Sequence, residues 1–279
     1  MDPQVAHKMS RSLEPYHGVI YFLDEATDAY AKLGVTGRDG YFASRSAPLG
    51  KVSASVVIAT FFNFNPSLIH HAIPSAWEQT TPAAMLDARL EAIDLGLRRL
   101  LGDVVDSPEV ARAAELARVV ADACTIPGRP LYAGHATLPW PTEPHLALWH
   151  AISLIREYRG DGHIACLVAE GLDAVGALIT HAASGAVPRV ALQMSRAWSD
   201  EAWEAGIARL VARGIVNEDG SFTDEGTALR QRIEDQTDVL ALPAWEALGE
   251  DGCQELRELV RPWSRTIVDS GVFLKLPGT

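Results

Sequence analysis

Two histidines and two tyrosines carry the acid–base chemistry that this sequence offers: His150, His163, Tyr21 and Tyr41. Imidazole titrates near neutral pH, so histidine is the first choice for moving protons, and a phenol can donate a hydrogen bond to a reacting oxygen. A weak internal repeat, described below, pairs Tyr21 with His150 and Tyr41 with His163. We therefore predict that these four side chains gather as catalytic or ligand-contacting groups. Ordinary core packing, with each polar atom hydrogen bonded, is the competing interpretation.

A second group of residues has the chemistry of a ligand pocket. Arginine receives a carboxylate or phosphate, or pairs with neighbouring acids, and clustered aromatic rings offer apolar area to a flat molecule. The segments "GYFASRSAPLG" and "TFFNFNP" concentrate such residues, and core packing is again the alternative. The predicted ligand-binding residues are His17, Arg45, Phe62, Phe64, Trp149 and Arg156.

The sequence lacks the usual motifs for metal and cofactor binding. His145 and His150 are five residues apart and His70 and His71 are adjacent, so neither pair presents two imidazoles on one helix face. The motifs HExxH, GxGxxG, GxxxxGK[ST] and GxSxG are absent, and the three cysteines lie far apart. We expect no metal site and no cofactor. The sequence leaves open whether a single histidine ligates haem, and no motif specifies one.

The residues from 188 to 242 predict three helices and a short hairpin. Ser199, followed by two acids, is a helix N-cap, and Gly214 ends that helix. The segment "GIVNEDGSFT" reads as two short strands around an Asp-Gly turn, and Thr223 then caps a long helix towards Leu242. With "PRVALQMSRAW" as the preceding helix, this is the order of elements in a winged helix-turn-helix.

The chain also contains a weak internal repeat. The segment "DGYFA" at 39–43 aligns with "DGHIA" at 161–165, and Ala-Trp and Ala-Arg-Leu follow in the same order and at nearly the same spacing in both halves. We favour a duplication, with coincidence as the alternative. The predicted fold is mainly α: a tandem pair of winged helix-turn-helix-like units related by a pseudo-two-fold repeat. They comprise residues 14–142 and 143–279, with a small β wing in the second half.

The Arg-Gly-Asp triplet at 159–161 is interpreted as a helix boundary and not as an adhesion signal. A helix is predicted from about His145 to Tyr158. Gly160 and Gly162 flank Asp161, which suits the end of that helix and the N-cap of a new one.

The net charge of −12 opposes binding to a phosphate backbone. The predicted recognition helix opens with Asp200, Glu201 and Glu204, and the turn "NEDGS" is acidic as well. We therefore expect nucleic acid not to be a partner. No apolar run approaches the ~20 residues that cross a bilayer, and the N-terminus lacks the features of a signal peptide. A cytoplasmic protein without a membrane partner is expected, and a homodimer is possible.

The whole chain resembles an uncharacterised, mainly actinobacterial family of helix-turn-helix (winged-helix) proteins. The resembling blocks are "GYFASRSAPLG", "ATFFNFNP", "AIPSAW", "PHLALWHAISLIREYRGDGH", "RAWSDEAW" and "IEDQTDVLALPAW". The resemblance implies a helix-turn-helix fold and a role in specialised metabolism or regulation. It implies no activity, cofactor or site residue.

Three functions are compatible with these observations. The first, which we expect, is a small-molecule-binding protein on a repurposed winged-helix scaffold, with an aromatic or anionic metabolite held where the two units meet. The second is a cofactor-independent biosynthetic enzyme that uses the same histidines and tyrosines for isomerisation or cyclisation. The third is a ligand-responsive DNA-binding transcription regulator. Whether the protein is an enzyme is left open by the sequence.

Overall fold

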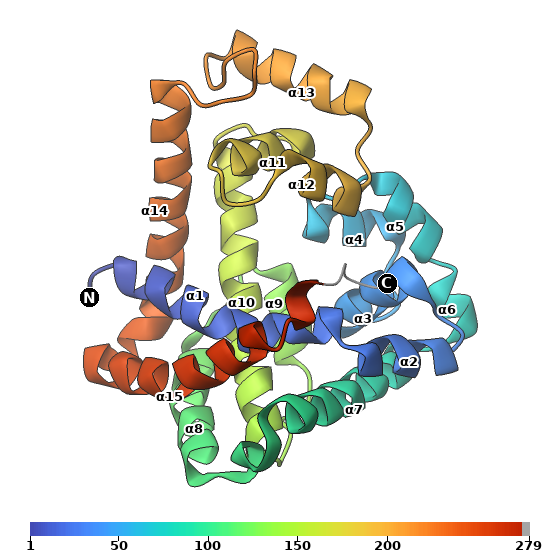
Figure 1. Ribbon diagram of the computed structural model, residues 1–279, viewed down its shortest axis with the longest axis vertical. Helices are drawn as coiled ribbons and strands as arrows, with labels where there is room; N and C mark the ends of the chain where they lie inside the picture. The colour runs from blue at the N-terminus through green and yellow to red at the C-terminus, as the bar shows by residue number, and fades with distance from the viewer. Residues whose placement is uncertain (275–279) are drawn as a thin grey trace.

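The computed structural model describes residues 1–274, which fold almost entirely into α-helices (Figure 1). The helices are α1 (Gln4–Gly18), α2 (Asp24–Lys32), α3 (Gly37–Ser46), α4 (Ala54–Phe61), α5 (Pro66–Ala72), α6 (Ala76–Gln79), α7 (Pro82–Leu101), α8 (Pro108–Ala123), α9 (Pro130–Ala136), α10 (Pro144–Ala169), α11 (Ala174–Ala183), α12 (Arg189–Arg196), α13 (Asp200–Ala212), α14 (Asp224–Glu246) and α15 (Gly249–Asp269). Short 3₁₀ turns lie at η1 (Val19–Phe22), η2 (Ala47–Leu49), η3 (Gly102–Asp106) and η4 (Val272–Leu274).

These helices enclose two hydrophobic cores. The larger core contains buried residues from Ala6 to Tyr158 and from Ala241 to Val272, and we call these parts of the chain the body. The second core contains buried residues from Cys166 to Ile233, and we call this segment the upper unit. In Figure 1 the upper unit, with α11, α12 and α13, lies above the body.

Two long helices enter both cores. The first part of α10 packs in the body and its last turn reaches the upper unit, while α14 begins in the upper unit and ends in the body. The two helices pack against each other and both connect the body with the upper unit in Figure 1. Within residues 1–274 no single helix is long and apolar enough to cross a membrane; α10 and α11 meet that criterion only jointly, as a pair bent by 100°.

The prediction of a helix boundary at the Arg-Gly-Asp triplet is wrong, because α10 continues through it to Ala169. The Arg129 guanidinium lies against Gly162, where a Cβ atom would come within 1.9 Å of Nη1. From there Arg129 donates to the carbonyl oxygens of Tyr158 at 2.9 Å and Leu240 at 3.2 Å. Gly162 is therefore needed for the approach of a side chain and not for a helix end.

Asp161 does cap a helix, but a different one from the helix that the sequence suggested. Its Oδ2 atom accepts from the backbone N–H groups of Leu131 at 3.0 Å and Tyr132 at 2.9 Å, at the start of α9. These donors have no partner inside α9, because the first N–H groups of a helix lack intrahelical acceptors. The carboxylate thus joins α9 to α10 across the body.

The local signals in the upper unit are confirmed, but the β wing is not formed. Ser199 accepts from Ala202 N–H at the start of α13, and Thr223 accepts from Gly226 N–H at the start of α14. The segment between these helices makes one antiparallel bridge, Val216 with Phe222, and no strand is present within residues 1–274. A single bridge is too short a ladder to count as a wing of two strands.

The tandem repeat, with its units at 14–142 and 143–279, stays a prediction. The two aligned segments occupy unlike positions: Asp39 lies in the first turn of α3, whereas Asp161 lies well inside α10. The cores also group the chain differently, since the body combines residues from both predicted units.

Candidate functional site

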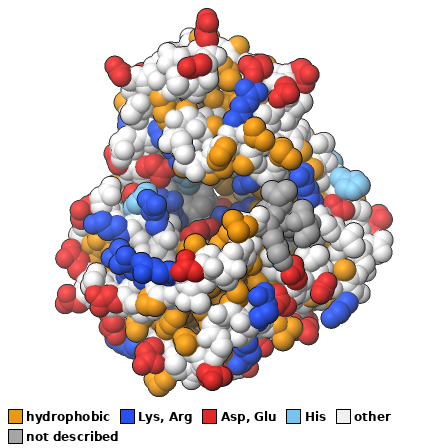
Figure 2. Space-filling model, in the orientation of Figure 1, with side chains coloured by type: hydrophobic (Ala, Val, Ile, Leu, Met, Phe, Trp, Pro, Cys, Tyr) orange, Lys and Arg blue, Asp and Glu red, His pale blue; other side chains and the backbone are white. Residues whose placement is uncertain are grey.

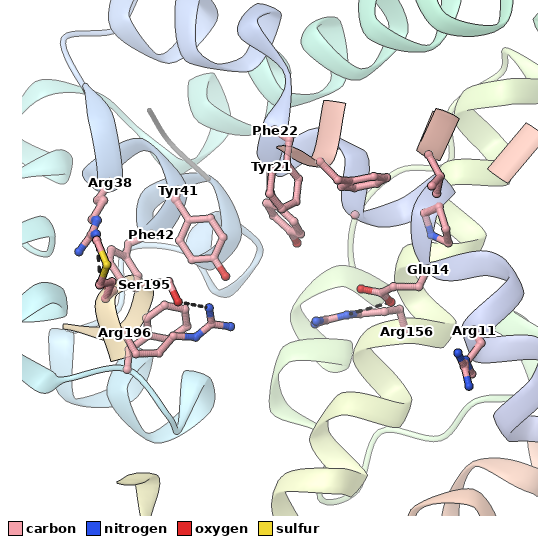
Figure 3. A pocket seen from close by; sticks show the side chains of 16 residues that line it. Arg11, Glu14, Tyr21, Phe22, Arg38, Tyr41, Phe42, Arg156, Ser195 and Arg196 are labelled. Carbon is pink, nitrogen blue, oxygen red and sulfur yellow. Dashed lines mark hydrogen bonds and ion pairs between the residues drawn. The ribbon is translucent and has the colours of Figure 1, made fainter. Parts of the chain in front are cut away.

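A cavity of about 580 Å³ lies between the body and the C-terminal end of α12. Aromatic and arginine side chains from α1, η1, α3, α10 and α12 dominate its wall (Figure 3). The lining residues are Arg11, Glu14, Pro15, Gly18, Tyr21, Phe22, Arg38, Tyr41, Phe42, Phe64, Arg156, Met194, Ser195, Arg196, Val268 and Phe273. The volume is within the range of small-molecule sites, about 300–1,000 Å³.

Hydrogen bonds hold the α12 wall in place. The turn after α12 begins at Ala197, which has a left-handed backbone with φ 56°. Asn65 donates to the carbonyl oxygens of Arg196 at 3.0 Å and Ala197 at 2.9 Å, and Trp198 Nε1 donates to the Asn63 carbonyl at 2.9 Å. The loop before α5 therefore fixes the position of Arg196 relative to the body.

Four polar groups converge on the cavity from opposite sides. Figure 3 shows the hydroxyl groups of Tyr21 and Tyr41 and the guanidinium groups of Arg156 and Arg196 pointing into the same space. Phe64 adds an apolar face, with the Arg196 guanidinium 4.9 Å from its ring centroid. A ligand here would meet aromatic faces and cationic donors together.

A chain of hydrogen bonds lies behind Tyr21 and fixes the tautomer of His17. Ser153 donates its hydroxyl proton to the Trp149 carbonyl at 2.8 Å, so its oxygen accepts from His17 Nδ1, 2.9 Å away. His17 Nε2 is then the acceptor for the Tyr21 hydroxyl at 3.3 Å, while Arg89 donates to the Tyr21 oxygen at 3.3 Å. Tyr21 is thus placed between a base and a cation, the arrangement required of a proton donor.

Burial keeps this network in its neutral forms. Desolvation lowers the pKa of His17 well below its ordinary value, with the Arg156 charge adding to the effect. Burial also raises the pKa of Tyr21, against the influence of Arg89. At neutral pH the network therefore consists of an imidazole base and a protonated phenol.

A buried carboxylate compensates part of the positive charge. Glu157 is 1% exposed, and its Oε2 atom lies 2.8 Å from Arg156 Nη1 and 3.7 Å from Arg45 Nη2. Burial opposes the charge of Glu157, but the two guanidinium groups outweigh burial and hold the pKa of that carboxyl well below its usual range. Glu157 is therefore ionised, and Glu14 Oε2 lies 3.7 Å from Arg156 Nε, so two carboxylates face the guanidinium groups of Arg45 and Arg156.

Two further guanidinium groups near the cavity lack an acidic partner. Arg89 is 2% exposed, and neither it nor Arg196 forms an ion pair with any residue in the described part of the chain. The Nε atoms of both have no hydrogen-bond partner. A buried charge costs free energy unless it is paired, so positive charge at this site exceeds what Glu157 and Glu14 balance.

Comparison with known proteins gives one match, to a helix-turn-helix family, over residues 6–274. The chain belongs to the helix-turn-helix family. No curated protein and no solved structure matches the chain. The segments predicted from sequence to form the helix-turn-helix are α12, the turn at Ala197 and α13, and the cavity borders the first of these helices.

In this helix-turn-helix protein, most of the residues predicted from sequence lie in or behind the cavity. Tyr21, Tyr41, Phe64 and Arg156 line it. Directly behind them, Arg45 donates to the Tyr41 hydroxyl at 3.1 Å, and the ring of Trp149 stacks 6.3 Å from that of His17. The acid–base pair that adjoins the cavity is thus Tyr21 with His17.

The predicted residues His150, His163 and Phe62 do not line the cavity. His150 packs edge-on against Trp140, with 4.8 Å between ring centroids, and burial lowers its pKa to about 4. His163 Nδ1 lies 3.0 Å from Thr237 Oγ1 on α14. Phe62, with φ 59° at the end of α4, packs against the upper core. The repeat had grouped these histidines with the tyrosines, and the helix geometry separates them.

Sequence reasoning missed the wall that α12 contributes. Met194, Ser195 and Arg196 belong to the helix that the sequence analysis predicted without assigning it to a site, and its packing against α3 and the loop before α5 brings them to the cavity. The adjacent blocks "TFFNFNP" and "RAWSDEAW", both singled out in the sequence, contact each other in the fold. Both blocks were identified in the sequence. Had a contact between them been predicted, it would have placed Arg196 at the site.

The surface of the helix-turn-helix motif is acidic. Asp200 and Glu204, at the start of α13, pair with Arg189 at 3.5 and 2.8 Å. Arg209 pairs with Asp173 at 2.8 Å. Acidic side chains also mark the outer surface of the upper unit in Figure 2. Arg189 and Arg209 are therefore paired with acids of the same unit. No cluster of three or more potential metal ligands occurs in residues 1–274.

Proposed function

We propose that the protein binds an anionic aromatic small molecule in the cavity between the body and α12. One observation carries the proposal: aromatic faces, the Arg196 guanidinium without an acidic partner in residues 1–274, and the Arg156 guanidinium meet at a partly open space of about 580 Å³. An anion there gains charge-assisted hydrogen bonds and relieves the unbalanced positive charge. The neighbouring rings of Tyr41 and Phe64, with centroids 5.7 Å apart, together offer an apolar surface to an aromatic ring. The Tyr21 hydroxyl oxygen beside them is available to a polar substituent.

Arg196 offers the cleanest test, because it has no carboxylate to leave unpaired when it is removed. We expect a panel of aromatic carboxylates and aromatic phosphate esters to raise the melting temperature, and their uncharged amide or alcohol analogues to have little effect. The substitution Arg196→Met should weaken binding about tenfold or more, since a hydrogen bond to a charged group contributes about 1.5–3 kcal/mol. Arg232→Met, on an exposed arginine of the upper unit, is the matched control and should bind as the wild type does.

Calorimetry with the best compound of the panel decides the outcome. A preference for uncharged analogues, or equal binding by Arg196→Met and the wild type, would show that the cavity does not select anions. A melting temperature of Arg196→Met close to the wild-type value keeps the comparison meaningful.

The second candidate is a DNA-binding regulator, which membership of the helix-turn-helix family favours. The acids at the start of α13 and the local pairing of its arginines weigh against direct contact with phosphates. A mobility-shift experiment at low salt with random and promoter-derived duplexes tests it. Tight binding that weakens steeply with salt would support the regulator; the ligand site would then serve as its sensor.

A further inference from the structure

A basic groove on the outer face of α1 and α15 adjoins the cavity. It measures about 620 Å³. Its lining includes five permanent cations, Lys8, Arg11, Arg257, Arg261 and Arg265, and a single carboxylate, that of Asp269. This excess of positive charge stands out in a chain with 36 Asp and Glu residues against 24 Lys and Arg, because most other surface arginines lie beside acids.

The cations of the groove are not neutralised by the body. Lys8, Arg11, Arg261 and Arg265 form no ion pair with residues 1–274, and Arg257 Nε donates only to the Ser12 hydroxyl at 3.2 Å. Arg257, Arg261 and Arg265 recur every four residues, so they lie on one face of α15, where like charges repel. The arrangement costs stability in the free protein, and a bound polyanion would offset that cost.

The groove and the cavity are neighbours that share part of their walls. Arg11, Pro15 and Val268 line both. On the face shown in Figure 2, basic side chains gather over α1 beside the central hollow. The row of cations on α15 therefore lies within reach of a long molecule whose ring occupies the cavity and whose tail crosses the rim at Arg11.

We infer that the natural ligand is an aromatic ring system carried on a chain of phosphates, with the ring in the cavity and the phosphates in the α1–α15 groove. Nucleoside diphosphates and flavin nucleotides have this chemistry. The inference rests on the proposed function and names the class of its anion. A nucleic-acid duplex fits less well, because the cations line a recess between two helices and the adjoining site is aromatic.

Two series of compounds that differ only in phosphates test the inference: adenosine, AMP and ADP, and riboflavin, riboflavin 5′-phosphate and flavin adenine dinucleotide. In at least one series we expect affinity to rise tenfold or more from the unphosphorylated to the diphosphate compound, with a steep dependence on salt. The double variant Arg261→Gln/Arg265→Gln should remove most of this gain and leave binding of an aromatic carboxylate unchanged. The control Arg209→Gln/Arg232→Gln makes the same charge change on the upper unit and should have no effect.

The outcomes separate the two proposals. If aromatic carboxylates bind but phosphates add no affinity in either series, or if the groove variant loses nothing, the inference fails and the proposed function stands. If neither carboxylates nor phosphorylated compounds bind, both fail. Binding of a duplex oligonucleotide that the groove variant abolishes, without binding of any nucleotide in the series, would assign the groove to nucleic acid and also overturn the inference.

Discussion

The body and the upper unit differ in what they bury. The body buries arginines, acids and histidines, and the upper core buries one polar side chain, Thr180, among the described residues. The buried polar and charged side chains of the body and its junction with α10 include Arg89, Arg129, Glu157, Asp161, His17, His135, His145 and His150. Burying such groups costs free energy, and several of them stand next to the cavity. The body therefore carries the chemistry of the site, while the upper unit is stabilised by an apolar core and surface ion pairs.

Removing one carboxylate from each region should give the largest contrast. Glu157→Gln removes the carboxylate that Arg45 and Arg156 share and leaves Arg156 with Glu14 alone, and breaking a buried pair of this kind costs about 3–5 kcal/mol. Glu204→Gln removes the partner of Arg189 on the surface of the upper unit and should cost about 1 kcal/mol or less. Urea unfolding of both variants measures the difference. Similar losses in the two variants would mean that buried charge does not distinguish the regions.

The pH dependence of stability should follow the buried histidines of the body. The pKa of His150 falls from 6.5 to about 4 on folding, so between these values the unfolded chain binds a proton that the folded chain does not. Stability contributed by the neutral imidazole is therefore lost as the pH decreases from about 6.5 towards 4. At pH 5 this one residue accounts for a loss of about 2 kcal/mol.

Unfolding at pH 7 and pH 5 checks this expectation. The variant His150→Leu should lose about 2 kcal/mol less than the wild type over that interval. His181→Leu in the upper unit should remove a smaller part of the pH-dependent loss of stability, because His181 is only partly buried. Desolvation lowers the pKa of His181 as well. An unchanged pH dependence in His150→Leu would contradict a buried neutral imidazole at this position.

Helix caps should contribute equally in the two regions and give the smallest effect. Thr223 caps α14 in the upper unit and Ser107 caps α8 in the body, each by accepting a backbone N–H. Either substitution by alanine should cost about 1 kcal/mol. Thermal unfolding with hydrogen exchange at the affected helix start measures both. A much larger loss in Ser107→Ala would show that the regions differ in more than buried charge.

Local structure could be predicted from the sequence where the signal was itself local. Ser199 and Thr223 marked the starts of α13 and α14 correctly, because a cap acts within one turn. The end of α10 was predicted wrongly, because Arg129, more than 30 residues away in the sequence, occupies the space beside Gly162. Glycine patterns alone cannot distinguish a helix end from room for a distant side chain.

The candidate site was predictable in its residue types but not in its grouping. Tyr21 and His17 are four residues apart, a spacing that brings side chains together in helical segments, and they do hydrogen bond. His150 and Arg156 are six residues apart on α10, which places them about 120° apart around the helix. Only one of the two can face the cavity, and it is Arg156.

The two helices that enter both cores decide how the halves of the molecule can move. A segment joined to the rest of a protein by one loop can rotate about that loop. The upper unit is joined to the body by two long helices, α10 and α14. Two connecting helices permit a small tilt or shear of the upper unit against the body and resist its rotation. A ligand that fills the cavity beside α12 would therefore change the tilt of the upper unit by a small angle and, with it, the direction in which α13 faces.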